Sequence, residues 1–456
     1  MRVHFIGIGG IGMSALARYF KAQKWAVSGS DATASQITEG LKKDGIRAKI
    51  GQKKANLDPN TDLVIITQAI KADNPELQAA RAWGIRVLTY PEAVGDLTTR
   101  YRTIAIAGAH GKSTTTALTS IMLMKAKLDP TIIVGTNLRE LGGKNFRQGR
   151  GEYLVLEADE FGNAFSHYSP ALAIITNIDR EHLDVYKTLA NVKRAFLNFI
   201  KNIVPGGALI VNRDDANLYS LRGAIAKIAK KNGLEVVWYT AKSNEMRAVK
   251  RTLKIAGAHN VSNALGVMAL GRALGISRGT ILAALGSYSG AWRRMELRGK
   301  FGGAPVYDDY AHHPTEIRAT LQAFKEKYPE RKLICVFQPH QARRLEALFK
   351  EFTTAFEDAD ATLILPIYRV TGRDEPRTPH DAEALAKAIQ KREKHKLLFY
   401  LPDPTRLIPA VRTLGAPLSK SLIIMMGAGD IANMTGVLLR SSPTARRSLQ
   451  KTRRSR

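Results

Sequence analysis

The sequence contains little cysteine and no long uninterrupted apolar run. Cys335 is its one cysteine, so no disulfide can form within the chain, as is usual in a reducing compartment. A membrane-spanning helix needs about 20 predominantly apolar residues, and no segment supplies them. The apolar N-terminal segment carries glycines spaced as in a strand-to-helix turn, and no small-residue cleavage site follows it, which argues against a signal peptide. We therefore expect a globular, cytoplasmic protein that is not inserted in a membrane.

Acidic residues are scarce relative to basic ones. The sequence has 69 Lys and Arg residues against 40 Asp and Glu, which gives a formal net charge of +29. This charge is compatible with a nucleic-acid-binding NTPase. However, the basic residues are spread along the chain without an aromatic-interleaved binding motif, so no nucleic-acid partner is expected. The segment 441–456 is basic and nearly devoid of apolar residues, which predicts a disordered tail.

Apolar runs that end in polar or glycine-rich turns alternate with amphipathic segments before this tail. Such alternation is typical of parallel sheets with crossover helices. The predicted fold class is α/β, with an N-terminal Rossmann-like domain over 1–102, a central P-loop ATPase-type domain with a parallel or mixed sheet over 103–296, and a C-terminal Rossmann-like domain over 297–440. The polar stretch 95–102 (GDLTTRYR) is predicted to be a linker. We expect a monomer or a homodimer.

A short glycine-containing loop joins the apolar strand TIAIAG to an apolar helix. A loop that holds nucleotide phosphates needs glycines for close backbone approach, a lysine for charge neutralisation and a Ser or Thr hydroxyl for Mg²⁺. Gly111, Lys112 and Ser113 supply these groups where a helix begins, and a helix N-terminus favours anions. The general pattern G-x-x-x-x-G-K-[ST] is not met, because Ile106 stands at its first position. The predicted ATP-phosphate loop consists of Gly108, Ala109, His110, Gly111, Lys112, Ser113 and Thr114.

A second glycine cluster lies near the N-terminus, between an apolar strand and an amphipathic helix. Gly7, Gly9, Gly10 and Gly12 match a dinucleotide-type fingerprint. Taken alone, this cluster indicates an NAD-dependent dehydrogenase with Asp31 on the ribose. That alternative leaves the central glycine-lysine loop without a role.

One carboxylate ends an apolar strand of the central segment. Glu157 closes the run YLVLE, and in open parallel sheets ligands bind at the carboxyl ends of the strands. Glu157 is therefore predicted to complete a Mg²⁺ shell that Ser113 begins. The alternative for Glu157 is a solvated helix start.

Seven motifs, in this order, resemble those of the Mur ligases, the ATP-dependent ligases of peptidoglycan synthesis. They are GIGGIGMS at 7–14, AGAHGKSTTT at 107–116, EADE at 157–160, TNIDREHLD at 176–184, AHNVSNAL at 258–265, DDYAHHPTEI at 308–317 and FQPH at 337–340. The resemblance implies three domains that bind a UDP-sugar, ATP and an amino acid in turn. It is strongest to the branch that joins L-alanine to UDP-N-acetylmuramate through an acyl phosphate, with ADP and phosphate as products. The alternative is the recycling branch, which joins a murein tripeptide to the same UDP-sugar.

The resemblance also implies where the nucleotides bind. In Mur ligases the first glycine turn, here together with Asp31, binds the pyrophosphate of the UDP-sugar rather than NAD. The adenine site of ATP is implied at His259, Asn260 and Asn263, whose amide side chains can pair with both donors and acceptors. Asp309 resembles the residue that engages the ADP ribose.

Five further positions resemble residues of the family's reaction centre. The resemblance implies that Arg294 reaches the ATP phosphates and that His182 binds a second Mg²⁺ as neutral imidazole. His312 matches the signature at the reacting groups, and His340 and Arg344 match positions near the amino acid carboxylate. Either His312 or His340 could accept a proton from the attacking amine.

The sequence departs from the family pattern at several positions. Ala109 stands where threonine is usual, and Phe161 and Gly162 follow EADE in place of serine and aspartate. Gln341 and Ala342 replace arginine and tyrosine, which bears on the choice of amino acid. Leu197 lies near the position of a carbamylated lysine that some Mur ligases carry and the alanine-adding branch lacks.

Overall fold

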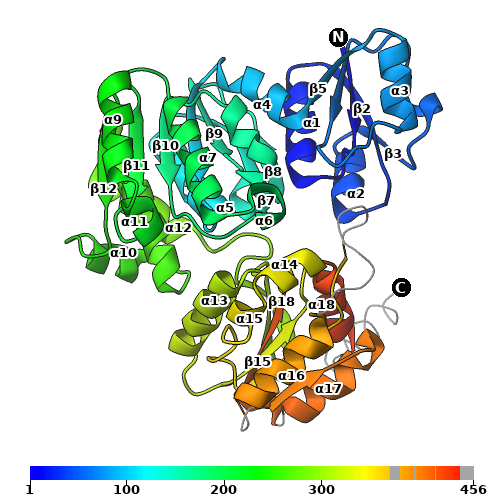
Figure 1. Cartoon of the computed structure of the whole chain (residues 1–456), viewed down its shortest axis with the longest axis vertical. Helices are drawn as coiled ribbons and strands as arrows, with labels where there is room; N and C mark the ends of the chain where they lie inside the picture. The colour runs from blue at the N-terminus through cyan, green and yellow to red at the C-terminus, as the bar shows by residue number, and fades with distance from the viewer. Residues whose placement is uncertain (370–379, 394–396, 416, 442–456) are drawn as a thin grey trace, which may run out of the picture. The chain divides into compact units, whose positions relative to one another are not determined.

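The computed structural model describes residues 1–369, 380–393, 397–415 and 417–441. These residues form two compact units (Figure 1). The first unit consists of residues 1–181, 185–253 and 262–288, and the second of residues 182–184, 254–261 and the chain from 289 onward. The predicted disordered tail lies, apart from Ser441, outside the described residues.

The first unit contains a five-stranded parallel sheet in the order β3-β2-β1-β4-β5. Its strands are β1 (Arg2–Ile6), β2 (Ala26–Asp31), β3 (Arg47–Ile50), β4 (Leu63–Ile66) and β5 (Arg86–Thr89), and its helices are α1 (Ile11–Ala22), α2 (Gln36–Lys43), η1 (Lys54–Asn56), α3 (Pro75–Ala82) and α4 (Tyr90–Thr98). Val3 and Phe5 share a hydrophobic cluster with residues of α1 and α2, whereas Ile6 and Val64 pack with residues of α3. Helices therefore cover both faces, as in a Rossmann-like sheet.

The same unit contains a second, seven-stranded sheet in the order β12-β11-β10-β6-β9-β7-β8. Its strands are β6 (Arg102–Ala107), β7 (Thr131–Leu138), β8 (Lys144–Arg147), β9 (Tyr153–Glu157), β10 (Leu172–Ile175), β11 (Ala208–Asn212) and β12 (Glu235–Tyr239). All neighbouring strands run parallel except β7 and β8. The sheet is thus mixed, and the loop that follows β6 emerges between β10 and β9.

Helical segments connect and flank these strands. They are α5 (Lys112–Lys125), η2 (Arg139–Leu141), η3 (Phe161–His167), α6 (Leu183–Tyr186), α7 (Leu189–Lys201), α8 (Ala216–Tyr219), α9 (Arg222–Asn232), α10 (Met246–Thr252), α11 (Ala258–Ala273) and α12 (Arg278–Ser287). α5 begins directly at the predicted phosphate loop.

The two sheets of the first unit share one hydrophobic cluster. Tyr19 of α1 meets Phe146 of β8 edge-on, with ring centroids 6.2 Å apart. Beside these rings, the buried Asn145 donates from Nδ2 to Ser14 Oγ at 3.0 Å and accepts from Arg18 Nη1 at 2.6 Å. Helix α1, which begins in the first glycine cluster, is therefore fastened to the second sheet.

The stretch 95–102 is not the linker that its polar composition predicts. Its residues up to Thr98 belong to α4, and Arg102 begins β6. α4 opens with a capping box, in which the Glu92 carboxylate accepts from Thr89 N at 2.7 Å. Val94 and Leu97 are buried in the shared cluster, so packing outweighs the polar composition of the segment.

The second unit contains a six-stranded sheet in the order β13-β14-β18-β15-β16-β17. Its strands are β13 (Glu296–Phe301), β14 (Ala304–Asp309), β15 (Lys332–Phe337), β16 (Ala361–Ile364), β17 (Leu397–Tyr400) and β18 (Ser421–Met426); its helical segments are α13 (Pro314–Lys327), α14 (Ala342–Ala347), α15 (Phe349–Phe352), α16 (Ala382–Arg392), η4 (Pro404–Arg406), α17 (Leu407–Leu414), η5 (Leu418–Lys420) and α18 (Ile431–Arg440). Only β13 runs antiparallel to its neighbour.

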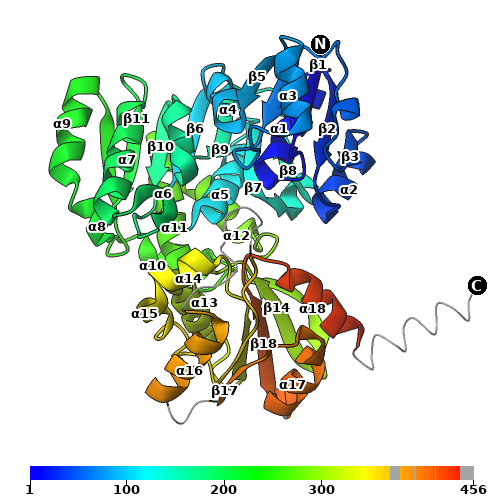
Figure 2. The same cartoon turned by 45° about the vertical axis from the view of Figure 1, so that its right-hand side comes forward.

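Helices cover both faces of this sheet (Figure 2), and alternate residues of its central strands belong to different hydrophobic clusters. Cys335 and Ile424 cluster with residues of α13 and α16, whereas Ile334 and Ile423 cluster with residues of α17 and α18. The predicted α/β fold class, with a mixed central sheet, is confirmed, and the exact domain boundaries stay predictions. Among the described residues, no helix is both long and apolar enough to cross a membrane.

Candidate active site

The loop after β6 turns into α5 through two glycines in left-handed conformations. Gly108 has φ 136° and Gly111 has φ 83°. A Cβ on Gly108 would lie 2.0 Å from Thr176 Oγ1, and one on Gly111 would lie 2.6 Å from Asn263 Oδ1. Both the backbone conformation and the lack of space therefore require glycine at these positions. Gly111 is the N-cap of α5 and brings no side chain over the first N–H groups of the helix, which stay available to an anion.

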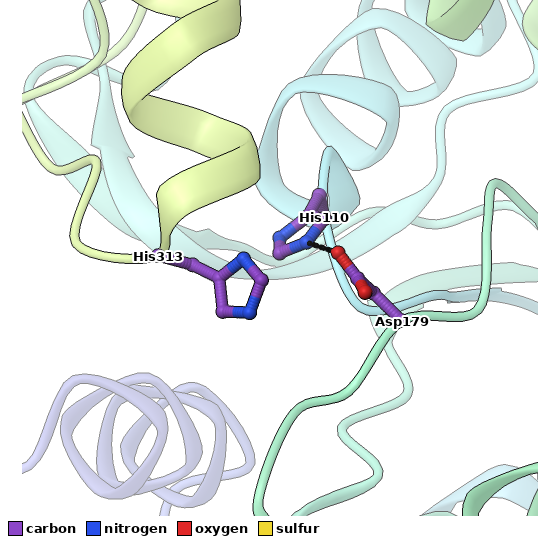
Figure 3. Close-up of side chains that lie close together, drawn as sticks. All are labelled: His110, Asp179 and His313. Carbon is purple, nitrogen blue, oxygen red and sulfur yellow. Dashed lines mark hydrogen bonds and ion pairs between the residues drawn. The ribbon is translucent and has the colours of Figure 1, made fainter. Parts of the chain in front are cut away.

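The neighbouring strand β10 holds this loop in shape. Asn177 follows β10, and its Oδ1 accepts from His110 N at 2.8 Å while its backbone carbonyl accepts from Ala109 N at 3.2 Å. The His110 ring points its Nε2 toward the Asp179 carboxylate, 2.9 Å away (Figure 3). The loop is thus organised by the protein itself, which spares a bound phosphate the entropic cost of ordering it.

The Lys112 side chain folds back over the phosphate loop. Its Nζ donates to the Gly108 carbonyl at 2.6 Å and to Glu160 Oε2 at 2.8 Å. Glu160 is 1% exposed, so the two charges form a largely buried pair. Burial alone would lower the pKa of Lys112, but the charges of Glu160 and Asp159 raise it above its ordinary value. The ammonium group therefore stays protonated at any physiological pH.

The first helical hydroxyl meets the carboxylate that ends β9. Ser113 Oγ donates to Glu157 Oε2 at 3.2 Å, and Glu157 Oε1 accepts from Gly135 N at 2.5 Å. Mg²⁺ holds its oxygen ligands at about 2.1 Å in an octahedron, which places adjacent ligands about 3 Å apart. The spacing of Ser113 Oγ and Glu157 Oε2 fits two such positions. Thr114, the next residue of α5, is buried.

The first glycine cluster lies where β1 passes into α1, away from the phosphate loop in the sequence but in the same unit. Gly7 has φ 86°, and a Cβ there would lie 2.4 Å from Thr67 Cγ2. Gly9 N donates to Asp31 Oδ2 at 2.8 Å. Asp31, which the sequence assigns to a ribose or a UDP-sugar, therefore braces the turn with one of its oxygens.

The residues assigned to adenine are divided between the two units. Asn263 belongs to the first unit, where it lies against Gly111. His259 and Asn260 belong to the second unit, and Asn260 Nδ2 donates to the Ala256 carbonyl at 2.6 Å. His182 also belongs to the second unit and has a left-handed backbone, with φ 54°. All three adenine candidates nevertheless lie at the start of the same helix, α11, which the boundary between the units crosses after Val261.

Aromatic and imidazole rings form a continuous series in the second unit. The ring centroids of Tyr310 and His312 are 5.3 Å apart, and those of His312 and His340 are 5.8 Å apart. His340 stacks on Tyr368, with centroids 5.6 Å apart and an interplanar angle of 9°. His312 Nδ1 lies 3.0 Å from the Tyr310 carbonyl and 3.3 Å from Glu316. Both candidate bases of the sequence therefore lie in one cluster.

Arginine side chains border this cluster. Arg344 Nη1 donates to the His340 carbonyl at 3.2 Å. Arg294 lies over the Tyr310 ring, 4.9 Å from its centroid, and 4.0 Å from Glu316. The structure thus brings His312, His340, Arg344 and Arg294 together.

The adjacent Arg293 is placed differently. It is 7% exposed, and its Nη2 donates to the Gly427 and Gly429 carbonyls, the latter at 2.9 Å. Burial lowers the pKa of Arg293 below its ordinary value. Arg293 therefore connects the beginning of the segment from 289 onward to the glycine turn after β18. This leaves Arg294 as the arginine that can contact a ligand.

Asp309 ends β14 and is 5% exposed. Its Oδ2 accepts from Met295 N at 2.8 Å and its Oδ1 from Ala311 N at 2.9 Å. Burial raises the pKa of Asp309, while these backbone bonds act in the opposite direction. Oδ1 also accepts from Thr320 Oγ1 at 3.3 Å, whereas Oδ2 keeps further acceptor capacity for a ribose hydroxyl.

Two residues that contact the candidate site residues are not identified by the sequence motifs alone. Glu160 pairs with Lys112, although EADE alone does not show which of its carboxylates faces the loop. Tyr368 stacks on His340 from the end of the run DATLILPIY. Its position after an apolar strand is the signal that could have identified it.

Three models of the Mur ligase family match consecutive parts of the chain. They are "Mur ligase family, catalytic domain" at residues 2–102, "Mur ligase middle domain" at 106–271 and "Mur ligase, glutamate ligase domain" at 293–429. UDP-N-acetylmuramate–L-alanine ligase of Desulfatibacillum aliphaticivorans is 38% identical over 445 residues, covering 94% of this chain and 96% of the relative. The chain belongs to the Mur ligase family.

Other Mur ligases extend this similarity. The UDP-N-acetylmuramate–L-alanine ligase of Acetivibrio thermocellus is 38% identical over 457 residues, covering 96% of this chain and 95% of that one. Among solved structures, UDP-N-acetylmuramate-alanine ligase from Thermotoga maritima matches with a TM-score of 0.78, 26% identity and complete coverage of both chains. A murein peptide ligase from Psychrobacter arcticus shares the fold, with a TM-score of 0.70, 24% identity, and coverage of 96% and 98%.

In this Mur ligase the residues that depart from the family pattern lie in different structural environments. Ala109 contacts Lys112 through its backbone carbonyl, at 3.2 Å, so its side chain does not decide that contact. Gly162 has φ 58°, and a Cβ there would lie 2.8 Å from Gln68 Oε1. Gln341 has φ 68° at the N-cap of α14, and Ala342 is fully buried.

Proposed function

We propose that this Mur ligase joins L-alanine to the lactyl carboxylate of UDP-N-acetylmuramate, with ATP cleaved to ADP and phosphate, in peptidoglycan precursor synthesis. The observation that carries the proposal is the near-complete match, at 38% identity, to relatives named for this activity. The arrangement of charged and donor groups in each unit agrees with it. A nucleotide sugar and ATP are cytoplasmic metabolites, so the reaction belongs in the cytoplasm.

ATP binds with its phosphates on the loop from Gly108 to Thr114. The first N–H groups of α5 and the Lys112 ammonium neutralise the phosphate charge. Ser113 and Glu157 are spaced to hold Mg²⁺, and His182 would be a ligand of a second ion. Mg²⁺ bound there would neutralise charge on the transferred phosphoryl group.

The remainder of ATP and the UDP-sugar occupy separate sites. Asn263, together with His259 and Asn260, is proposed to bind adenine, and Asp309 the ribose. The UDP-sugar pyrophosphate is proposed to lie at the turn formed by Gly7, Gly9, Gly10 and Gly12, which Asp31 braces.

The chemistry must convert a carboxylate into a group that an amine can attack. Oxide is a very poor leaving group, whereas transfer of the γ-phosphoryl group gives an acyl phosphate that loses phosphate. Lys112 and Arg294 stabilise the charge that shifts during this transfer. Arg344 and His340 hold the alanine carboxylate. The amine must lose a proton, and His312 or His340, whose rings lie in contact, accepts it.

The deciding experiment is ATP-dependent phosphate release with UDP-N-acetylmuramate against separate amino acids. L-alanine should give release and a product heavier by one alanine residue in mass spectrometry. Glycine and L-serine arms test whether Gln341 and Ala342 broaden the choice of amino acid. Release with the murein tripeptide and not with L-alanine would establish the recycling activity instead.

A further inference from the structure

The first residue of α4 lies over the glycine turn. A Cβ on Gly12 would lie 2.7 Å from the Tyr90 hydroxyl and 2.8 Å from Tyr90 Cζ. The phenol therefore occupies the space that a side chain at position 12 would need. Both residues belong to the first unit, so this contact lies within one compact body.

The start of α4 fixes the position of this phenol. Thr89 N donates to Glu92 Oε2 at 2.7 Å, and Pro91 lies in the first turn of the helix. Gly95 packs so closely on His167 that a Cβ there would lie 2.6 Å from the His167 carbonyl oxygen. A hydrogen bond from a side chain held in this way costs little additional ordering.

The glycine turn has few backbone donors left for an anion. The N–H groups of four successive residues are engaged within the protein: Gly7 and Ile8 on the Ser30 carbonyl, Gly9 on the Asp31 carboxylate, and Gly10 on the Gly7 carbonyl. A pyrophosphate at this turn therefore needs donors from outside it, beyond the first N–H groups of α1.

The Tyr90 hydroxyl is such a donor. Burial raises the pKa of Tyr90, and the charges of Glu157 and Asp159 raise it further, so the phenol keeps its proton. Within residues 1–369 and the other described segments, this hydroxyl makes no hydrogen bond. Tyr90 is half-buried, so its hydroxyl is accessible to a ligand.

We propose that the Tyr90 hydroxyl donates a hydrogen bond to a pyrophosphate oxygen of the nucleotide sugar at the glycine turn. The identity of the nucleotide sugar rests on the proposed function. A neutral donor suits this place, because it serves the anion without forming an ion pair with Glu157 or Asp159, which the phosphoryl-transfer site needs.

The test compares Tyr90→Phe with the matched variant Tyr153→Phe. Tyr153 begins β9, at the opposite end from Glu157, and its hydroxyl accepts from Arg102 at 3.1 Å. Both variants keep the aromatic ring. Calorimetry measures the affinity for UDP-N-acetylmuramate, and for UDP-N-acetylglucosamine, which has the pyrophosphate but no lactyl carboxylate. Tyr90→Phe should weaken both affinities by about 10- to 100-fold, as expected for a hydrogen bond to a charged group, and leave the KM for ATP unchanged.

Three outcomes would overturn the proposal. Unchanged affinity for both sugars would show that the hydroxyl touches neither. Weaker binding of UDP-N-acetylmuramate alone would place the contact at the lactyl carboxylate. An equal loss in Tyr153→Phe would show a general effect of removing a hydroxyl. Because binding is measured without turnover, failure of the wild type to ligate L-alanine would refute the proposed function and not the Tyr90 contact.

Discussion

Lys112 has two roles in the structure, and substitution can separate them. Its ammonium lies at the phosphate loop and also pairs with the buried Glu160 at 2.8 Å. Lys112→Met keeps the length of the side chain and removes the charge. Loss of one group that stabilises transferred charge typically lowers turnover by about 10²–10³-fold. Loss of one partner of a buried ion pair lowers the free energy of unfolding by about 3–5 kcal/mol.

The double variant Lys112→Met, Glu160→Gln distinguishes these two losses. It removes both charges, so urea denaturation should show that most of the lost stability returns. Phosphate release with UDP-N-acetylmuramate and L-alanine should stay as low as in the single variant. Lys201→Met, at an exposed position on α7, controls for the loss of a surface charge and should behave like the wild type.

Two results would refute this reasoning. If Lys112→Met kept turnover within about tenfold of the wild type, the loop lysine would not neutralise transferred charge. If the double variant regained activity together with stability, Lys112 would act only by holding Glu160.

Three further predictions follow from other contacts. Glu157→Gln should raise the Mg²⁺ concentration needed for half-maximal turnover by at least about tenfold, and an unchanged Mg²⁺ dependence would remove Glu157 from the metal site. Burial alone would raise the pKa of the Glu76 carboxyl, but hydrogen bonds from His4, Ser30 and Asn56 hold this pKa below its ordinary value. The ionised carboxylate therefore stabilises the fold fully above the ordinary pKa of glutamate, about 4.3, and this stabilisation is lost as pH falls through the lower folded pKa. Glu76→Gln should make the free energy of unfolding, measured with urea, less dependent on pH in the acid range, and an unchanged pH dependence would contradict this assignment. Arg293→Ala should lower the free energy of unfolding by about 1–3 kcal/mol, because it leaves the Gly427 and Gly429 carbonyls without their donor. Arg294→Ala should instead lower turnover with little change in stability. The reverse pattern would exchange the roles of the two arginines.

The sequence is most informative where chemistry requires particular residues in a fixed order. Gly108 and Gly111 can be recognised in the sequence because a phosphate loop needs glycines. The structure gives the reason, since the left-handed backbone and the close neighbours at both positions exclude other residues. The buried strands are identifiable because their apolar runs end in polar turns, as at Glu157 and Asp309. The α/β class follows from the alternation of these runs with helices.

Other features depend on contacts that no local pattern encodes. Residues 95–98 of the polar stretch 95–102 are helical, as part of α4, because Leu97 is buried in the shared hydrophobic cluster. The hydrogen bond from Asn145 of β8 to Ser14 of α1 joins positions 131 residues apart in the chain. The choice of Glu160 over its neighbours as the partner of Lys112, and the stacking of Tyr368 on His340, depend on side-chain directions that only the folded chain determines.

The hydrophobic cluster shared by the first two sheets also limits where the polypeptide can be divided. A fragment ending at Arg102 would expose Tyr19 and Leu97 to water, and the remainder would expose Phe146. Asn145 would lose its partners on α1 at the same cut. The smallest fragment that preserves this interface therefore contains both sheets, and insertions or fusions near Arg102 would have to leave α4 and β8 in contact with α1.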